Sequence, residues 1–180
     1  MLYFQGNLPL MISKPQPGEY VDYQGTYINL VGNLPVLDVL TASQSNTHAL
    51  LYGVPLEKEE YAYAEGKWTI KEVVNHMIDT ERIFAYRLLS FARGEKQGLP
   101  GFEQDDYAKQ SFANERLLHD LADEFRAVRE SSLYLVRNLN EQQLANIGTS
   151  NNKPLSARAL VYMMAGHELH HIQILKERYL

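Results

Sequence analysis

Four long segments of this 180-residue chain repeat their apolar residues every three or four positions, and this spacing most constrains the fold. Such a period gathers the apolar side chains of a helix on one face, which must then be buried against another element. No segment shows the every-second-residue alternation of a half-buried strand. The pattern predicts an all-α protein, a four-helix bundle with long connecting loops over residues 53–68 and 95–111.

Capping residues mark where these helices start and end. Thr69 and Glu72 give the strongest start signal, because each side chain can bond the backbone N–H of the other in a capping box. Asn33, followed by Pro35 in the first turn, opens an earlier helix, and Gly94 is a natural stop. These signals predict long helices over residues 34–52, 70–93, 114–139 and 156–180, with a short extra helix over residues 140–147.

The start of the chain is not expected to contribute to the fold. Residues 2–6 (LYFQG) look like the remnant of a tag-removal protease site, and residues 11–25 carry two prolines and two glycines. We expect residues 1–10 to be a tag remnant and disordered start, followed by an extended arm to residue 25. On length, residues 11–180 form a single domain.

Composition excludes several classes of function. The chain has no cysteine, which rules out disulfides, thiolate nucleophiles and sulfur-ligated zinc. The formal net charge is -5 and the basic residues are scattered, which argues against nucleic acid as a partner. No apolar run approaches the ~20 residues that span a membrane, and the N-terminus is not a secretory signal. We therefore expect a cytoplasmic protein with neither membrane nor nucleic-acid partners.

The segment from His167 to His171, with the letters HELHH, carries the strongest chemical signal. Read literally it is the zinc-peptidase motif, in which two imidazoles one helical turn apart bind the metal and a glutamate acts on a water. On a helical wheel these two histidines lie within about 20° of the centre of the apolar stripe, whereas His170 points about 80° away. Two buried imidazoles need polar partners, and one metal ion serves both. The pair predicts a metal site in the core.

A third ligand has to come from another helix, and spacing alone leaves the choice open. His48 and His119 lie outside the apolar stripes, and His76 lies about 120° from the centre of its own stripe, on a flank. Glu81 falls near the centre of that stripe, where a carboxylate needs a partner. It is either a fourth ligand, a group that orients a ligand imidazole, or half of a buried ion pair with an arginine of another helix.

The surroundings of the motif do not fit a zinc peptidase. Only residues 172–180 follow His171, and Ile174 and Glu177 stand where a metzincin needs glycine and histidine. A di-iron bundle needs two E-x-x-H motifs, and the chain has one, starting at Glu168. Because Glu168 lies about 60° or more around the helix from both histidines, we expect a solvated or ion-paired surface residue. If Glu168 has a function, we expect it to support a neighbouring metal ligand without binding the metal itself.

The sequence resembles the DinB/YfiT-like superfamily of bacterial four-helix-bundle metalloproteins over roughly residues 14–180. The likeness is densest in EGKWTIKEVVNH and DTER, within residues 65–82, and in AGHELHH, residues 165–171; the loop LPGF adds to it. In that family, one histidine of the second helix and two histidines of the last helix bind a divalent metal. The resemblance places these ligands at His76, His167 and His171.

The resemblance also implies a range of activities. The family includes metal-dependent S-transferases of low-molecular-weight thiols, an isomerase of similar thiol dependence, and members with no assigned reaction. Three neutral histidines leave metal positions open for water or substrate, and zinc or nickel there would lower the pKa of a water or a substrate thiol. We expect a metal-dependent transferase or hydrolase with a small-molecule substrate, which must supply any thiol itself.

No residue can be assigned as the general base from the sequence. A function of another class remains open, namely a non-catalytic metal-binding module or a stress-linked interaction module. Bundles of this kind often pair through exposed apolar edges, so a homodimer is expected.

Overall fold

Helix α3 (Ile70–Ala92) begins at the capping box that the sequence predicts. The Glu72 N–H donates to the Thr69 hydroxyl at 3.2 Å, and the Thr69 N–H donates to the Glu72 carboxylate at 2.8 Å. At the other end the chain leaves the helix through Gly94, whose φ of 83° lies in the left-handed region that glycine adopts without strain. Both ends of the central helix are therefore set by local sequence.

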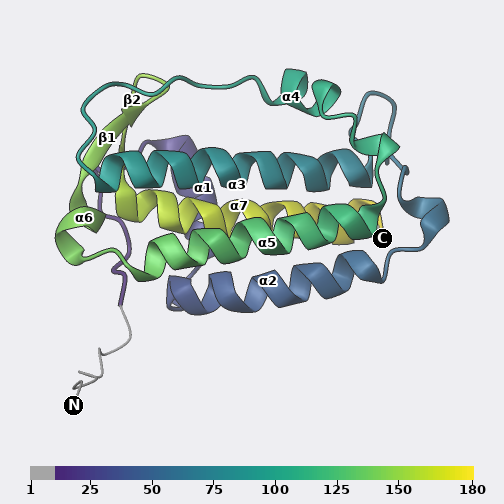
Figure 1. Cartoon of the computed structure of the whole chain (residues 1–180), viewed down its shortest axis with the longest axis horizontal. Helices are drawn as coiled ribbons and strands as arrows, with labels where there is room; N and C mark the ends of the chain where they lie inside the picture. Colours follow the sequence, from purple (N-terminus) through teal and green to yellow (C-terminus); the bar gives the residue numbers. More distant parts are fainter. Residues whose placement is uncertain (1–10) are drawn as a thin grey trace, which may run out of the picture.

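Four long helices form the bundle in this computed structural model, which describes residues 11–180. The expected tag remnant and disordered start, residues 1–10, lie outside the described residues. The helices are α2 (Val36–Tyr52), α3, α5 (Leu118–Arg137) and α7 (Ala157–Arg178). Helices α2 and α3 each pack against α5 and α7, and α2 and α7 run opposite to α3 and α5 (Figure 1). The prediction of an all-α four-helix bundle is confirmed.

Several predicted helix boundaries are wrong by a few residues. The first long helix begins at Val36 with Pro35 at the N-cap, so Asn33 does not cap it. The third begins at Leu118, because the preceding residues form a 3-10 turn, η2 (Ala113–Glu115), that packs on α3. The short extra helix, α6 (Glu141–Ala145), has the expected Asn140 cap and ends two residues early. Another 3-10 turn, η1 (Leu56–Lys58), lies in the first connection.

Three short elements lie in segments that were expected to be irregular. Helix α1 (Asp22–Leu30), which packs against α7, begins within the last residues of the expected arm and continues beyond it, and the long second loop contains α4 (Gln104–Gln110). A hairpin of β1 (Ile147–Ser150) and β2 (Lys153–Ser156) lies at one end of the bundle beside α6 (Figure 1). Its turn residues Asn151 and Asn152 have φ of 50° and 58°, the left-handed conformation that two-residue hairpin turns need.

The core is divided along the bundle by a buried polar layer. One apolar cluster holds the first turns of α2 and α7 with the last turns of α3 and α5, and a second cluster holds the opposite halves. Between them each long helix places polar side chains inside the bundle. The buried members are Ser43, Thr47, His76, Thr80, Glu81, Arg129, Ser132, His167 and Glu168. This layer is where the chemistry of the molecule lies.

Candidate metal centre

Three histidines from two helices meet inside the polar layer. Helix α3 supplies His76, and α7 supplies His167 and His171 one turn apart. The Nε2 atom of His167 lies 3.1 Å from the Nε2 of His76 and 3.1 Å from the Nε2 of His171. One potential ligand atom from each of the three residues lies within 4.8 Å of the others. Although His76 lies on the flank of its stripe, it reaches the other two because α3 packs directly against α7.

Burial keeps all three imidazoles neutral. Burial, with a smaller effect from the neighbouring histidines, lowers the pKa of His76 to about 4 and the pKa of His171 to about 3. The pKa of His167 is well below 6.5 for the same reasons, with a small contribution from Arg129. At neutral pH each ring therefore has a free lone pair, the form in which imidazole binds metal.

The geometry of the cluster fits a metal ion better than a set of hydrogen bonds. The Nε2 of His167 has either one N–H or one lone pair in the plane of its ring, yet it faces two other ring nitrogens. It cannot make two good in-plane hydrogen bonds at once. Two imidazole nitrogens on a tetrahedral zinc ion lie about 3.3 Å apart, given Zn–N bonds of about 2.0–2.1 Å. The observed 3.1 Å separations are close to that value.

Aromatic side chains enclose the histidines. The ring of Trp68 lies 4.8 Å from the ring of His76, and Tyr27 of α1 lies edge-on to His167 with the ring centres 5.5 Å apart. Tyr27 is held close because α1 crosses α7 at Gly166. A Cβ on Gly166 would lie 2.0 Å from the Tyr27 carbonyl oxygen, so only glycine allows this approach. The helix that sequence reasoning missed thus forms one wall of the site.

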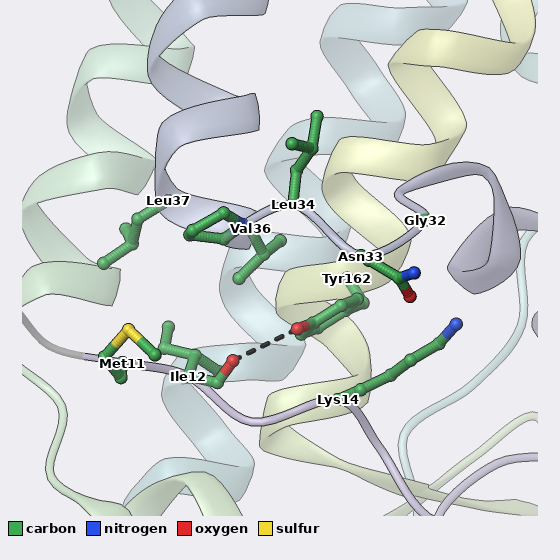
Figure 2. Close-up of a pocket in the computed structure, with 10 residues that line it drawn as sticks. Met11, Ile12, Lys14, Gly32, Asn33, Leu34, Val36, Leu37 and Tyr162 are labelled. Carbon is green, nitrogen blue, oxygen red and sulfur yellow. Dashed lines mark hydrogen bonds between the residues drawn. The ribbon is translucent and has the colours of Figure 1, made fainter.

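The cluster opens onto a cavity of about 300 Å³. His76 and His167 form part of its lining, together with residues from α1, α3, the loop after Pro100 and the hairpin. Another cavity, of about 260 Å³, lies between the N-terminal arm, the start of α2 and α7, where the Tyr162 hydroxyl donates to the Ile12 carbonyl (Figure 2). It shares no lining residue with the first. The histidine cavity is therefore the candidate substrate site.

Glu81 and Glu168 are partners of one buried arginine. Arg129 of α5 donates to both carboxylate oxygens of Glu81, at 2.8 and 3.0 Å, and to one oxygen of Glu168. Glu168 also accepts hydrogen bonds from Ser43 and Thr47 of α2. For Glu81 the structure shows the ion pair with an arginine of another helix, and neither carboxylate is hydrogen-bonded to an imidazole among residues 11–180.

The expectation that Glu168 lies on the surface is wrong. Its side chain is buried, because α7 is covered by α2 on the face that Glu168 occupies as well as by α3 on the histidine face. A carboxylate bound in this way to Arg129, Ser43 and Thr47 is turned toward α2 and not toward a water on the histidines. Arg129 is not singled out in the sequence analysis. Its position on the apolar stripe of α5, one turn after Phe125, is a signal that predicts burial.

The other histidines lie outside the cluster. His48 of α2 bonds the Asp123 carboxylate at 2.8 Å, and the ring of the exposed His119 stacks on Tyr52 with centres 4.3 Å apart. His170 is half-buried and packs edge-on against Tyr27, and its ring centre lies 5.1 Å from that of His171. Among residues 11–180, the only group of three or more potential ligand side chains close enough to hold a metal ion is the three-histidine cluster.

A four-helix bundle with three neutral histidines converging beside an internal cavity defines a class of metal-site bundle proteins. Within that class the chain belongs to the DinB superfamily, whose model matches residues 40–175. A relative from Oceanobacillus iheyensis, named as a proposed metal-dependent hydrolase, is 27% identical over 121 residues, which are 67% of this chain and 69% of the relative.

A solved structure supports the same fold. YfiT from Bacillus subtilis, described as a probable metal-dependent hydrolase with an unusual four-helix bundle topology, superposes with a TM-score of 0.69 over 92% of both chains, at 16% identity. At that identity the likeness concerns the fold. No helix within residues 11–180 is long and apolar enough to cross a membrane.

Proposed function

We propose that this protein is a metal-dependent enzyme of the hydrolase type, in which His76, His167 and His171 bind a divalent ion beside the substrate cavity. The observation that carries the proposal is the convergence of three neutral imidazoles at the wall of a cavity of about 300 Å³, with the Nε2 of His167 lying 3.1 Å from the Nε2 atoms of both His76 and His171. Both relatives described above carry names that refer to metal-dependent hydrolysis, which supports the same reaction type. Zinc or nickel is the expected ion, because imidazole ligands suit both.

The chain supplies binding and water exclusion around the ion. Three neutral ligands leave its charge uncompensated and leave coordination positions for water or substrate, as in catalytic rather than structural sites. A divalent ion there would act as a Lewis acid that lowers the pKa of a water or a thiol. Tyr27, Trp68 and Phe84 pack around the imidazoles and keep bulk water away from them.

Metal content tests the site directly. Protein purified without a chelating resin is analysed for metal by plasma mass spectrometry, and we expect one divalent ion per chain. His167→Ala and His171→Ala should each lose most of the metal. His170→Ala is the matched control, because it removes an imidazole from the same helix outside the cluster and should keep full occupancy. Full occupancy in His167→Ala would refute the site.

Turnover is tested separately from binding. Metal-loaded and metal-stripped samples are compared on p-nitrophenyl esters, anilides and phosphate esters, with the His171→Ala variant as a control. We expect metal-dependent hydrolysis of at least one class of substrate. If fully loaded protein turns over nothing in these panels or in the thiol assay that follows, the non-catalytic metal-binding module becomes the better description.

Thiol transfer is the second candidate reaction. The observation in its favour is that Glu81 and Glu168, the two buried carboxylates of the polar layer, are both ion-paired with Arg129, so neither is free to deprotonate a water. A thiol loses its proton more easily than water and needs less help from a base. Because the chain has no cysteine, the thiol must be a substrate. Glutathione or free cysteine with 1-chloro-2,4-dinitrobenzene, with and without metal, tests this reaction.

A further inference from the structure

The cavity beside the histidines contains a buried cation without an acidic partner. Arg87 of α3 is 8% exposed and contributes to the cavity lining. Among residues 11–180, no carboxylate lies within ion-pair distance of its guanidinium, and its one hydrogen bond goes to the Pro100 carbonyl at 2.8 Å. By contrast, the buried Arg129 has two carboxylates. Buried charges in proteins are nearly always paired, so a buried guanidinium without a carboxylate partner, as at Arg87, is unusual.

The hydrogen bond to Pro100 explains only part of the environment of Arg87. It ties α3 to the loop after Leu99, which the hairpin also holds through the Asn151 N–H to Leu99 carbonyl bond at 3.0 Å. A guanidinium has five N–H donors, and a single carbonyl uses one of them. The loop could be anchored by a neutral amide at lower cost. Burial lowers the pKa of Arg87, and the phenol of Tyr23 is the group that opposes this effect.

A second polar group in the same cavity also lacks a partner. The Thr80 hydroxyl lies on α3 two turns before Arg87, is inaccessible to solvent, and makes no hydrogen bond in the structure. Thr80 lines the cavity together with His76, one turn earlier. A buried hydroxyl without a partner costs stability unless something else satisfies it. Along one face of α3 the lining of the cavity thus contains a histidine, a threonine whose hydroxyl has no partner, and an arginine without an ion pair.

We infer that the substrate carries a carboxylate that Arg87 receives, and a polar atom nearer the histidines that meets the Thr80 hydroxyl. The planar guanidinium matches a carboxylate, which can accept two parallel N–H bonds from it. The lining also includes the apolar side chains of Phe84, Leu155 and Met163, beside further neutral polar residues such as Gln24 and Ser150. Glu103, the one acidic residue in the lining, is exposed at the rim and makes no ion pair with Arg87. A small aryl or alkyl carboxylate fits this pattern.

This inference rests on the proposed function only in using the same cavity, and its test works without metal. Phenylacetate and its neutral analogue phenylacetamide are the probes, with binding to metal-stripped protein followed by ligand-observed NMR and calorimetry. We expect phenylacetate to bind at least 10-fold more tightly than phenylacetamide. Equal affinity for the two probes in the wild-type protein would overturn the inference.

Two substitutions identify the groups responsible. Arg87→Gln keeps a donor for the Pro100 carbonyl and removes the charge, so phenylacetate binding should weaken by about 10- to 100-fold, the effect of losing charge-assisted hydrogen bonds. Binding of phenylacetamide should change little. The contact with Thr80 is tested with 4-hydroxyphenylacetate, which carries a second polar atom. Thr80→Val should weaken binding of 4-hydroxyphenylacetate but not of phenylacetate, and should leave the stability of the free protein unchanged or higher, because it removes an unsatisfied hydroxyl. A purely structural role for Thr80 predicts lower stability instead.

The remaining outcomes separate this inference from the proposed function. If Arg87→Gln binds phenylacetate as tightly as wild type, in the stripped or the zinc-loaded form, the carboxylate sits elsewhere and the inference is wrong. If the wild-type protein takes up no metal but still prefers the carboxylate through Arg87, the proposed function fails and the inference stands. Should Arg87→Gln fail to fold by circular dichroism, the comparison of the two probes and the Thr80→Val variant still decide.

Discussion

Replacing Arg129 by methionine should be among the most damaging single changes in the bundle. Arg129 is fully buried and donates three hydrogen bonds to carboxylates, two to Glu81 and one to Glu168, with a further bond to the Ser43 hydroxyl at 3.2 Å. Methionine fills most of the same volume but leaves both carboxylates buried without a cation. The change therefore removes charge compensation with little change in packing.

The expected loss follows from the number of bonds broken. Removing one partner of a buried ion pair costs about 3–5 kcal/mol. Arg129 serves two carboxylates that are 3% and 1% exposed, so we expect the upper end, about 5 kcal/mol. Domains of this size are stable by about 5–15 kcal/mol, so this one change could remove much of the total. Adding Glu81→Gln and Glu168→Gln removes the stranded charges, and this triple variant should recover more than half of the loss.

Urea unfolding followed by circular dichroism at pH 7.5, in the presence of a chelator, measures these differences. Arg126→Met is the matched control, because Arg126 lies one turn earlier on α5 and forms an exposed pair with Asp123 that contributes at most about 1 kcal/mol. The reasoning is refuted if Arg129→Met costs no more than the control. It is also refuted if the triple variant is no more stable than Arg129→Met alone.

Three further predictions concern the site and its wall. In chelated protein the folded-state pKa values of about 4 for His76 and about 3 for His171 lie below the unfolded value of 6.5. Stability should be full above pH 6.5 and fall as the pH drops toward 4, on the order of 3 kcal/mol for His76 alone; a flat urea-stability profile would contradict this. Zinc at 1,000 times its Kd should stabilise the wild type by about 4 kcal/mol but not His171→Ala, measured by thermal unfolding. Gly166→Ala should cost at least about 1–3 kcal/mol because its Cβ meets the Tyr27 carbonyl, whereas Gly53→Ala, with ordinary contacts, should be nearly neutral.

The long helices could be predicted because their signals are local. The Thr69–Glu72 box and the apolar periods of α3 and α5 depend only on neighbouring residues, and the structure places both helices where those signals lie. The short elements depend on tertiary contacts instead. Helix α1 contains Gly25 and has a weak apolar pattern, so its packing on α7 is what stabilises it. The Asn151–Asn152 turn was a usable hairpin signal, but its four-residue strands are too short to show an alternating pattern.

The candidate metal site could be predicted only in part from the sequence, for the same reason. His167 and His171 share one helix, so the wheel alone places them together on a buried face. His76 lies on the flank of a different helix, and its prediction as a ligand rested on the resemblance to a family; the packing of α3 on α7 brings it beside His167. The burial of Glu168 depends on α2, which covers the face of α7 that Glu168 occupies. The spacing of residues within α7 cannot show that α2 packs there. Sequence reasoning therefore fails mainly where a residue's partner lies on another element.

The three histidines and the opposite wall of the cavity lie on different kinds of element. The three histidines and Arg129 lie on long helices fixed by the two apolar clusters, so the geometry of the histidine cluster is protected by the core. The opposite wall of the cavity comes from α1, the loop after Pro100 and the hairpin turn, which are short and lie at the edge of the bundle. Substitutions in these segments can reshape the cavity without a large loss of stability, because they remove few core contacts. Selectivity for substrate should therefore vary with the short connections, while the ion and its ligands stay with the bundle.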